Sequence, residues 1–337
     1  MMRFDSSSLG LALAASALLF GCGSDAEECP ESGTPVQRNG RLRVEGTQLV
    51  NQCGEPVQLK GTSSMWLNWD GGDYATNKNG LQYMRDHWNM SVFRAAMGVD
   101  PGPGQGGYLE APEENEEKIH TIVQNAIDLG VYVVIDWHDH HAEDHQAEAE
   151  EFFATMAETY KDVPNVLYEV YNEPLRVSWR NVLKPYHEAL VSTIRAIDPH
   201  NVIILGTGSW SQDVDDAAAD PVAGANLMYT LHFYSGTHTG WLRNRSTAAI
   251  EDGLPLMVTE WGASHADGGT DGELHLDEAR LWHDWMDEHS IGWMAWKYDG
   301  CQDTTCFFVD RQASPDGGWT DADLNGHAPF VIDRMQN

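Results

Sequence analysis

Short apolar runs recur along the chain from about residue 57 onward. They are rich in Val, Ile and Tyr, which favour β-strands, and each has the length of a buried strand. Between the runs, apolar residues repeat every three or four positions, which is the period of an α-helix that buries one face. The predicted strands cover residues 57–61, 91–95, 131–136, 166–171, 202–205, 227–233, 256–259 and 292–296.

The clearest helical pattern covers residues 119–127, and Gly130 follows where that helix should end. Alternating strands and helices place the chain in the α/β class, and eight such units predict a (β/α)8 TIM barrel. We therefore expect a single catalytic domain over residues 37–337. Further helices are predicted over 149–160, 185–197 and 279–286, and a small N-terminal β-hairpin over 41–44 and 48–50.

The N-terminus has the pattern of a targeting segment. Residues 9–20 are largely apolar but too few to span a bilayer, so residues 1–21 are predicted to be a signal peptide. The run ends in Leu-Phe-Gly-Cys, which resembles a bacterial lipobox and predicts lipidation of Cys22. The alternative is an ordinary signal peptide followed by a stray cysteine. Residues 22–36 are polar and predict a tether, so we expect an exported protein, either lipid-anchored at the bacterial cell envelope or surface, or secreted.

Four cysteines remain after Cys22, and an even number in an exported chain suggests two disulfides. Three pairings of Cys29, Cys53, Cys301 and Cys306 are possible, and proximity favours Cys29–Cys53 and Cys301–Cys306. Their spacings match no zinc pattern.

The formal net charge of −32 narrows the range of expected binding partners. Such a chain repels phosphate backbones, so we expect no nucleic-acid partner, and a neutral substrate fits better than a polyanion. The 13 Trp residues offer rigid flat surfaces with polar edges, which suit sugar rings, although most Trp residues are expected in the core. We expect a monomer that meets the membrane only through its lipid anchor.

Polar and aromatic residues stand at the ends of six predicted strands, where a TIM barrel carries its chemistry. Two of them, Glu173 and Glu260, each follow an apolar strand, and glycoside hydrolysis requires two carboxyl groups on either side of the scissile bond. A single such Glu is often only a salt-bridge partner at the rim. A pair in the company of the other strand-end residues favours catalysis. The others include Arg94, His138, Asn172, His232, Tyr234 and Trp296.

Eight stretches of the sequence resemble glycoside hydrolase family 5, in particular its bacterial cellulase branch, over roughly residues 38–310. They are VQLKGTSS, VFRAAM, VYVVIDWH, LYEVYNEP, IILGTGSWSQDV, LMYTLHFYSGTH, LMVTEWG and GWMAW, in family order. The resemblance implies a barrel with catalytic Glu residues on its fourth and seventh strands. It also implies a retaining endo-β-1,4-glucanase that works by double displacement through a covalent glycosyl-enzyme intermediate, with no cofactor and no metal.

The resemblance also implies a role for each strand-end residue. Glu173 would be the general acid and base, and Glu260 the nucleophile. Arg94 would keep Glu260 ionised and Tyr234 would orient it, while the negative charge of Glu260 would raise the pKa of Glu173. Asn172 would bind the sugar 2-hydroxyl. The remaining implied sugar contacts are His138 and His232 around the same subsite, Trp296 as its floor, Trp69 on the glycone side and Trp210 on the leaving-group side.

Two positions depart from the family pattern. The cellulase branch usually has a His where Met65 stands, and it usually continues after Trp296 with a Ser/Asn-rich loop that carries a Lys. Here Lys297 is followed by the segment that ends in Cys301. These departures leave the fine substrate preference open, so mixed-linkage glucan, xyloglucan and mannan are alternative substrates to β-1,4-glucan.

Two other functions compete with the glycosidase interpretation. The segment 138–145 contains four His and two Asp, which suggests a metal-dependent hydrolase, but metal-site barrels place a His-x-His pair on the first strand and here it follows the third. The second alternative is a non-catalytic carbohydrate-binding lipoprotein on a decayed barrel. The presence of both Glu residues with Arg94 and Tyr234 argues against such decay.

Overall fold

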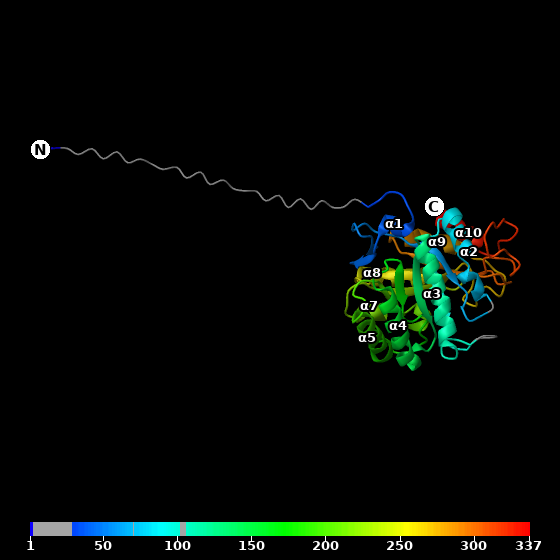
Figure 1. Ribbon diagram of the computed structural model, residues 1–337, viewed down its shortest axis with the longest axis horizontal. Helices are drawn as coiled ribbons and strands as arrows, with labels where there is room; N and C mark the ends of the chain where they lie inside the picture. Colours follow the sequence, from blue (N-terminus) through cyan, green and yellow to red (C-terminus); the bar gives the residue numbers. More distant parts are fainter. Residues whose placement is uncertain (3–28, 70, 102–105) are drawn as a thin grey trace.

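The computed structural model describes residues 1–2, 29–69, 71–101 and 106–337 (Figure 1). The predicted lipidation site Cys22 lies outside the described residues, and so does the predicted signal peptide except for its first two residues. Among the helices that the structure does describe, none is both long and apolar enough to cross a membrane.

Eight parallel strands close into a barrel in the order β10-β3-β4-β5-β6-β7-β8-β9, so the predicted fold class is confirmed. The closure places the carboxyl ends of all eight strands at one rim. The strands are β3 Lys60–Ser64, β4 Val92–Gly98, β5 Tyr132–His138, β6 Val166–Glu169, β7 Ile203–Leu205, β8 Leu227–Tyr234, β9 Leu256–Gly262 and β10 Trp293–Tyr298.

The first barrel strand begins three residues later than predicted. Val57 and Leu59 alternate like the buried positions of a strand, but both pack against the N-terminal hairpin in an apolar cluster that includes Leu49. The backbone N–H of Val57 donates to the carbonyl of Leu49, which ties this segment to the hairpin. The barrel strand itself, β3, contains Thr and Ser, so its sequence lacks the apolar run that marks the other strands.

Helices surround the barrel, and those predicted from the apolar period are present. The helix predicted over residues 119–127 is the middle of α3, and Gly130 ends it with a left-handed backbone at φ 67°. The helix predicted from residue 185 is α5, and it is preceded by a π-helical turn, Trp179–Leu183. The α-helices are α1 Pro35–Asn39, α2 Lys78–Trp88, α3 Pro112–Leu129, α4 Gln146–Tyr160, α5 Lys184–Arg195, α6 Gly208–Ser211, α7 Val214–Ala219, α8 Gly240–Glu251, α9 Leu276–Glu288 and α10 Ala328–Gln336.

The N-terminal segment is fastened to the amino end of the barrel. Strands β1 (Arg43–Glu45) and β2 (Gln48–Val50) form the predicted antiparallel hairpin. Both disulfides that proximity favoured are present, and the first joins Cys29 to Cys53 beside the hairpin. Helix α1 begins at Pro35, inside the range 22–36 that was predicted to be a tether, and Cys29 of the same range is bound to Cys53.

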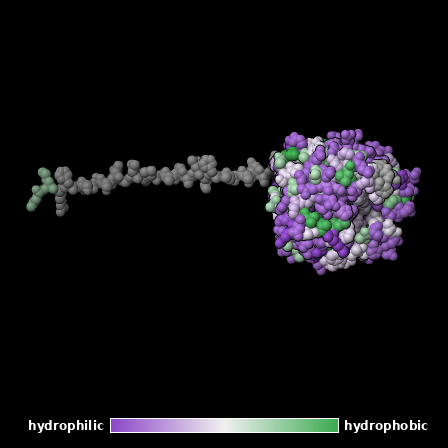
Figure 2. Space-filling model, turned by 90° about the horizontal axis from the view of Figure 1, so that it is seen from below, coloured by the Kyte–Doolittle hydropathy of each residue, from purple (hydrophilic) through white to green (hydrophobic). Residues whose placement is uncertain are grey.

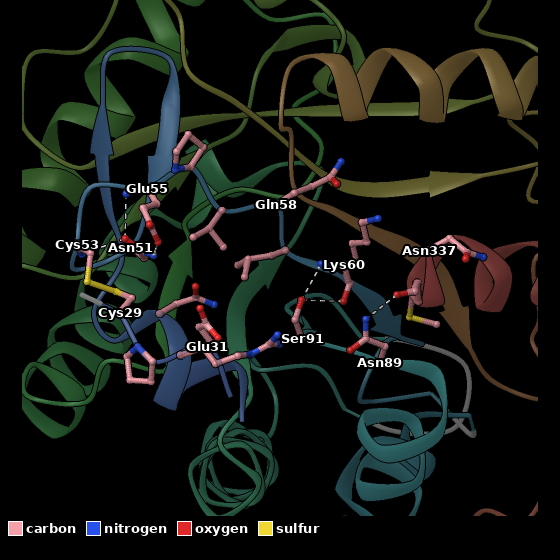
Figure 3. Close-up of a pocket in the computed structure, with 17 residues that line it drawn as sticks. Cys29, Glu31, Asn51, Cys53, Glu55, Gln58, Lys60, Asn89, Ser91 and Asn337 are labelled. Atoms are coloured by element: carbon pink, nitrogen blue, oxygen red, sulfur yellow. Dashed lines mark hydrogen bonds between the residues drawn. A yellow bond between two sulfur atoms is a disulfide. The ribbon is translucent and has the colours of Figure 1, made fainter. Parts of the chain in front are cut away.

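A pocket of 720 Å³ opens beside this disulfide (Figure 3). Lys60, the first residue of β3, and Ser91, just before β4, belong to its lining. It therefore lies at the amino ends of the strands, away from the rim that carries the strand-end residues. On the face seen in Figure 2, hydrophilic residues predominate and hydrophobic ones form only small patches, as the strongly acidic composition suggests.

Candidate active site

Two carboxyl groups face each other at the carboxyl rim of the barrel. Glu260 is the fifth residue of β9, and Glu173 follows the end of β6 by four residues. One carboxyl oxygen of each, together with a ring nitrogen of His232, lies within 4.8 Å of the others. This proximity suits a retaining arrangement, in which the carboxyl groups are about 5–5.5 Å apart, rather than an inverting one, which requires about 6.5–9.5 Å.

Glu260 is held at both oxygens. The hydroxyl of Tyr234 donates to Oε1 at 2.6 Å, and Nη1 of Arg94 donates to Oε2 at 3.1 Å. Burial raises the pKa of Glu260 above its usual value, and the charge of Glu173 raises it further. The cations His232 and Arg94 and the Tyr234 hydrogen bond oppose this rise in pKa. The charge of Glu260 therefore depends on its cationic neighbours.

Arg94 itself is fully buried and shared among several acceptors. Its Nε donates to Glu169 at 2.7 Å, and its Nη2 lies 2.9 Å from Asp136. Burial raises the pKa of Asp136 well above its usual value, whereas Arg94 is the main cause that lowers the pKa of Glu169. In this arrangement Glu169 is the charged partner of Arg94, while burial opposes a charge on Asp136.

The same guanidinium orients Asn172. Nη2 of Arg94 donates to the side-chain oxygen of Asn172 at 2.6 Å. The amide nitrogen of Asn172 is consequently turned away from Arg94, and it lies 3.5 Å from Nε2 of His138. An N–H donor is thereby presented beside the two carboxyl groups, where a sugar hydroxyl could accept.

His232 bridges the second carboxyl group to the buried network. Its Nδ1 lies 2.9 Å from Oε1 of Glu173, and its Nε2 lies 2.8 Å from the hydroxyl of Thr259. Burial lowers the pKa of His232, but the nearby carboxylates of Glu169, 3.8 Å from Nε2, and of Glu173 outweigh this and raise the pKa to about 9. His232 is therefore a cation at neutral pH, in direct contact with the Glu173 carboxyl group.

His138 forms a neutral counterpart on the other side of the site. Its Nδ1 lies 2.6 Å from Asp136, and its ring stacks on Trp296 with centroids 5.4 Å apart and an interplanar angle of 5°. Burial lowers the pKa of His138 well below its usual value, and Arg94 adds to this effect. A neutral imidazole that stacks on Trp296 fixes the orientation of that indole.

Aromatic residues extend the site in both directions. Trp69 packs beside Trp66 on one side, with ring centroids 5.6 Å apart. On the other side a pocket of 620 Å³ has both catalytic candidates in its lining, along with Trp210 and Trp241. Trp210 is 38% exposed and Trp241 is 50% exposed, so both indoles are open to a ligand.

The comparisons with known proteins agree with this geometry. Residues 50–302 match the family described as Cellulase (glycosyl hydrolase family 5). The chain belongs to glycosyl hydrolase family 5. It is 43% identical over 298 residues to an endoglucanase of Clostridium saccharobutylicum, covering 87% of this chain and 64% of that protein.

Two solved structures are also similar to this chain. A protein from Cytophaga hutchinsonii has a TM-score of 0.86 at 42% identity, over 90% of this chain and 97% of that chain. The catalytic domain of Thermobifida fusca endoglucanase Cel5A, as a variant in complex with cellotetraose, has a TM-score of 0.84 at 31% identity, over 90% of this chain and all of that chain. The chain spans slightly under two thirds of the length of the first curated relatives that it matches.

Both positions that depart from the family 5 cellulase pattern, Met65 and Lys297, are buried next to Trp296. Met65 is buried and packs with Tyr234 and Trp296, so an apolar group occupies the place of the usual His. Lys297 is buried as well, and its ammonium group lies 3.3 Å from Asp303 inside the loop closed by the Cys301–Cys306 disulfide. The ammonium is also 5.8 Å from the Trp296 ring centroid, so Lys297 contacts that indole as well.

The His-rich segment after β5 is spread over separate contacts. His138 binds Asp136, His140 lies 3.2 Å from the backbone carbonyl of Glu173, and His145 lies 3.1 Å from Asp139. These three imidazoles thus each have a separate partner in the rim.

Sequence reasoning missed Glu169 and Trp241. Glu169 is the last residue of β6 and lies within the stretch LYEVYNEP. Its position four residues before Glu173 was the only signal in the sequence that it lies below the catalytic candidates. Trp241 lies at the start of α8, outside any strand. The available signal was its position in the sequence shortly after the family stretch that ends in LHFYSGTH.

Proposed function

We propose that this chain is a retaining endo-β-1,4-glucanase. The observation that carries the proposal is the paired environment of the two carboxyl groups. Glu260 accepts hydrogen bonds from Arg94 and Tyr234. Glu173 lies near Glu260 and is hydrogen-bonded to His232. The endoglucanase names of the relatives and the cellotetraose complex of the Thermobifida enzyme support a β-glucan substrate.

In the first step a Glu260 oxygen attacks the anomeric carbon, and protonated Glu173 gives its proton to the leaving oxygen. The glycosidic bond breaks as the glycosyl-Glu260 ester forms. Glu173 is then a carboxylate, which the His232 cation stabilises. In the second step Glu173 removes a proton from water, the water oxygen attacks the same carbon, and Glu260 leaves as a carboxylate. Two inversions give net retention.

The remaining residues position the sugar. Asn172, oriented by Arg94, would donate to the 2-hydroxyl, a contact that strengthens in the transition state. Trp296 would stack on the reacting sugar, Trp69 on the glycone side, and Trp210 with Trp241 on the leaving-group side. Aromatic surfaces on both sides of the cleavage point fit a chain that is cut internally.

The proposal is tested by the product pattern on carboxymethylcellulose, lichenan and glucomannan, with NMR of the first-formed anomer. We expect internal cleavage of carboxymethylcellulose and a β-anomer product. A 2-deoxy-2-fluoro cellobioside with a good leaving group should label wild type on the peptide that contains Glu260, and Glu260→Gln should escape labelling. Preference for glucomannan would assign the chain to another β-glycanase activity, and an α-anomer would refute the retaining mechanism.

We also propose that the protein is exported and anchored through a lipid on Cys22. The lipobox-like run before Cys22 supports this, and so do the two disulfides, which form in oxidising compartments. In a bacterial host, the full chain should fractionate with membranes and take up labelled palmitate. Cys22→Ser should lose both properties, and equal palmitate incorporation by the two chains would disprove the anchor.

A further inference from the structure

A cluster of two imidazoles and two carboxylates lies on the loop that joins β9 to α9. Nε2 of His265 and Nε2 of His275 are 3.0 Å apart. Oε2 of Glu273 lies 3.8 Å from each of these nitrogens, and Oδ2 of Asp271 lies 3.9 Å from the His265 nitrogen. The three atoms from His265, Glu273 and His275 therefore converge on one point.

The dimensions of this cluster match a transition-metal site. The atoms form a triangle with sides of 3.0, 3.8 and 3.8 Å, and a point about 2.1 Å from all three lies within it. Zinc ligands lie about 2.0–2.1 Å from the ion for imidazole nitrogen and about 2.0–2.2 Å for carboxylate oxygen. Two imidazoles with carboxylates also suit zinc better than calcium or magnesium, which prefer oxygen ligands alone.

We propose that His265, Glu273 and His275 bind a divalent cation of the zinc type, with Asp271 available as a fourth ligand. A simple N–H···N hydrogen bond between the imidazoles would explain their own distance. It would not account for a carboxylate oxygen at equal distance from both nitrogens. All four side chains are at least 31% exposed, so the ion can enter from solvent.

Contacts outside the cluster hold the two imidazoles in place. The hydroxyl of Thr237 lies 3.5 Å from Nδ1 of His265, which leaves Nε2 of that ring for the ion. The backbone N–H of His275 donates to Ala263 at 2.7 Å, which closes the loop at its base. Gly236 is required beside it, because a Cβ at that position would lie 2.5 Å from the His275 ring.

The bound ion would stiffen one wall of the cleft. Ala266, next to His265, belongs to the lining of the pocket that holds Trp210 and Trp241, and its N–H donates to Thr237. The same loop accepts a hydrogen bond from Thr305 at the carbonyl of Gly268, which connects it to the disulfide loop. The ion has a structural role here, and the chemistry at Glu173 and Glu260 does not involve it.

The test is zinc binding to the chelator-treated full-length protein, measured by calorimetry and by the shift in melting temperature. We expect one Zn²⁺ per chain and a higher melting temperature with Zn²⁺ than with Ca²⁺. His265→Ala and His275→Ala should each weaken zinc binding by at least the 10- to 100-fold that loss of an outer-shell partner costs. His200→Ala, which alters an exposed imidazole elsewhere, should leave binding unchanged.

A second control separates this cluster from the active site, because Glu173, His232 and Glu260 also lie within 4.8 Å of one another. Glu173→Gln should retain the zinc site that His275→Ala loses, and anomalous scattering at the zinc edge should place the ion at His265. Loss of binding in Glu173→Gln with retention in His275→Ala would place the ion in the cleft. That result, or wild type without a zinc-induced shift in melting temperature, would overturn the proposal.

Discussion

Nη1 of Arg94 lies 3.1 Å from Oε2 of Glu260, and both side chains are almost completely buried. Burial raises the pKa of Glu260, whereas the guanidinium charge lowers it. The same guanidinium is bound to Glu169 and Asn172, so it cannot turn away without breaking those contacts. Arg94 thus sets both the charge and the position of the proposed nucleophile.

Arg94→Lys should move the acid limb of kcat/KM to higher pH. Removal of the hydrogen-bonded guanidinium leaves the pKa of Glu260 raised by burial and by Glu173, so the carboxylate gains a proton at a higher pH than in wild type. An opposite charge at this distance typically shifts a pKa by about 1–3 units, and we expect a shift of about one unit because Lys retains part of the charge. The pH profile on a soluble cellodextrin measures it.

Arg94→Lys also loses the second guanidinium nitrogen, which orients Asn172. The kcat should therefore fall by about 10²-fold at any pH, an effect of the size typical for a lost transition-state contact. Tyr234→Phe is the matched control. It removes a neutral hydrogen bond that lowers the same pKa, and so should shift the limb in the same direction by a smaller amount. An acid limb that stays in place in both variants would show that another group controls it.

The barrel could be predicted from the sequence because most strands are continuous apolar runs. The exception was β3. The apolar alternation at Val57 and Leu59 belongs to the cluster that joins the hairpin to the barrel strands, and the strand itself is Lys-Gly-Thr-Ser-Ser. A pattern of alternating buried positions shows that a segment is buried, but it does not show whether the segment belongs to the barrel sheet or packs beside it. The Cys29–Cys53 disulfide could be predicted from the cysteine spacing, whereas the short helix α1 could not, since one capped turn in a polar segment leaves no apolar period.

The candidate site residues that lie within the family motifs could be named from the sequence. Residues that reach the site only through tertiary contacts could not. No local pattern shows that Glu169 shares Arg94 with Glu260, because their strands meet only in the closed barrel. The charges around Glu260 likewise depend on tertiary contacts. Burial raises the pKa of Glu260, and His232 is the added cation, with a pKa raised to about 9.

Glu173→Gln should affect substrates according to their leaving groups. A natural glucan needs a proton on the leaving oxygen, so its kcat should fall by about 10²- to 10⁴-fold, the range for loss of general acid catalysis. An aryl cellobioside with an acidic phenol leaves without that proton, so its first step should be nearly unchanged. A burst of phenol followed by slow turnover is the expected time course, since the second step still lacks its base.

Azide provides the control for this experiment, because an anionic nucleophile needs no general base. It should restore turnover of the aryl substrate by Glu173→Gln and yield a β-glycosyl azide, while Glu260→Gln should form no such product. Equal loss of activity on glucan and aryl substrates would contradict the acid/base role of Glu173.

Trp241→Ala should weaken the action on long chains more than on short ones. The indole is half exposed and lines the pocket with Trp210, so only a chain that extends beyond the cleavage point on that side can stack on it. Loss of one such stacking contact costs about 1 kcal/mol, which is a factor of about five in kcat/KM. Cellopentaose and cellohexaose compared with cellotriose measure the difference, and an exposed aliphatic such as Leu281→Ala serves as the matched control.

His283→Phe should flatten the dependence of stability on pH. His283 is buried against Trp261, Trp293 and Phe330, and burial holds its pKa well below the usual 6.5. The unfolded chain binds a proton at this residue below about pH 6.5 and the folded chain does not, so the stabilising contribution is present above pH 6.5 and is lost as pH falls. His187, His238 and His327 have pKa values lowered to about 4 by burial and act in the same direction.

Each such histidine contributes a slope of up to about 1.4 kcal/mol per pH unit to the free energy of unfolding, so His283→Phe should reduce the slope between pH 6 and 4.5 by about that amount. Urea unfolding at several pH values measures it. The slope is the readout because the packing change alters the absolute free energy at every pH alike. His200→Ala, an exposed site, should leave the slope unchanged, and a wild-type slope retained in His283→Phe would mean that His283 is protonated in the folded protein.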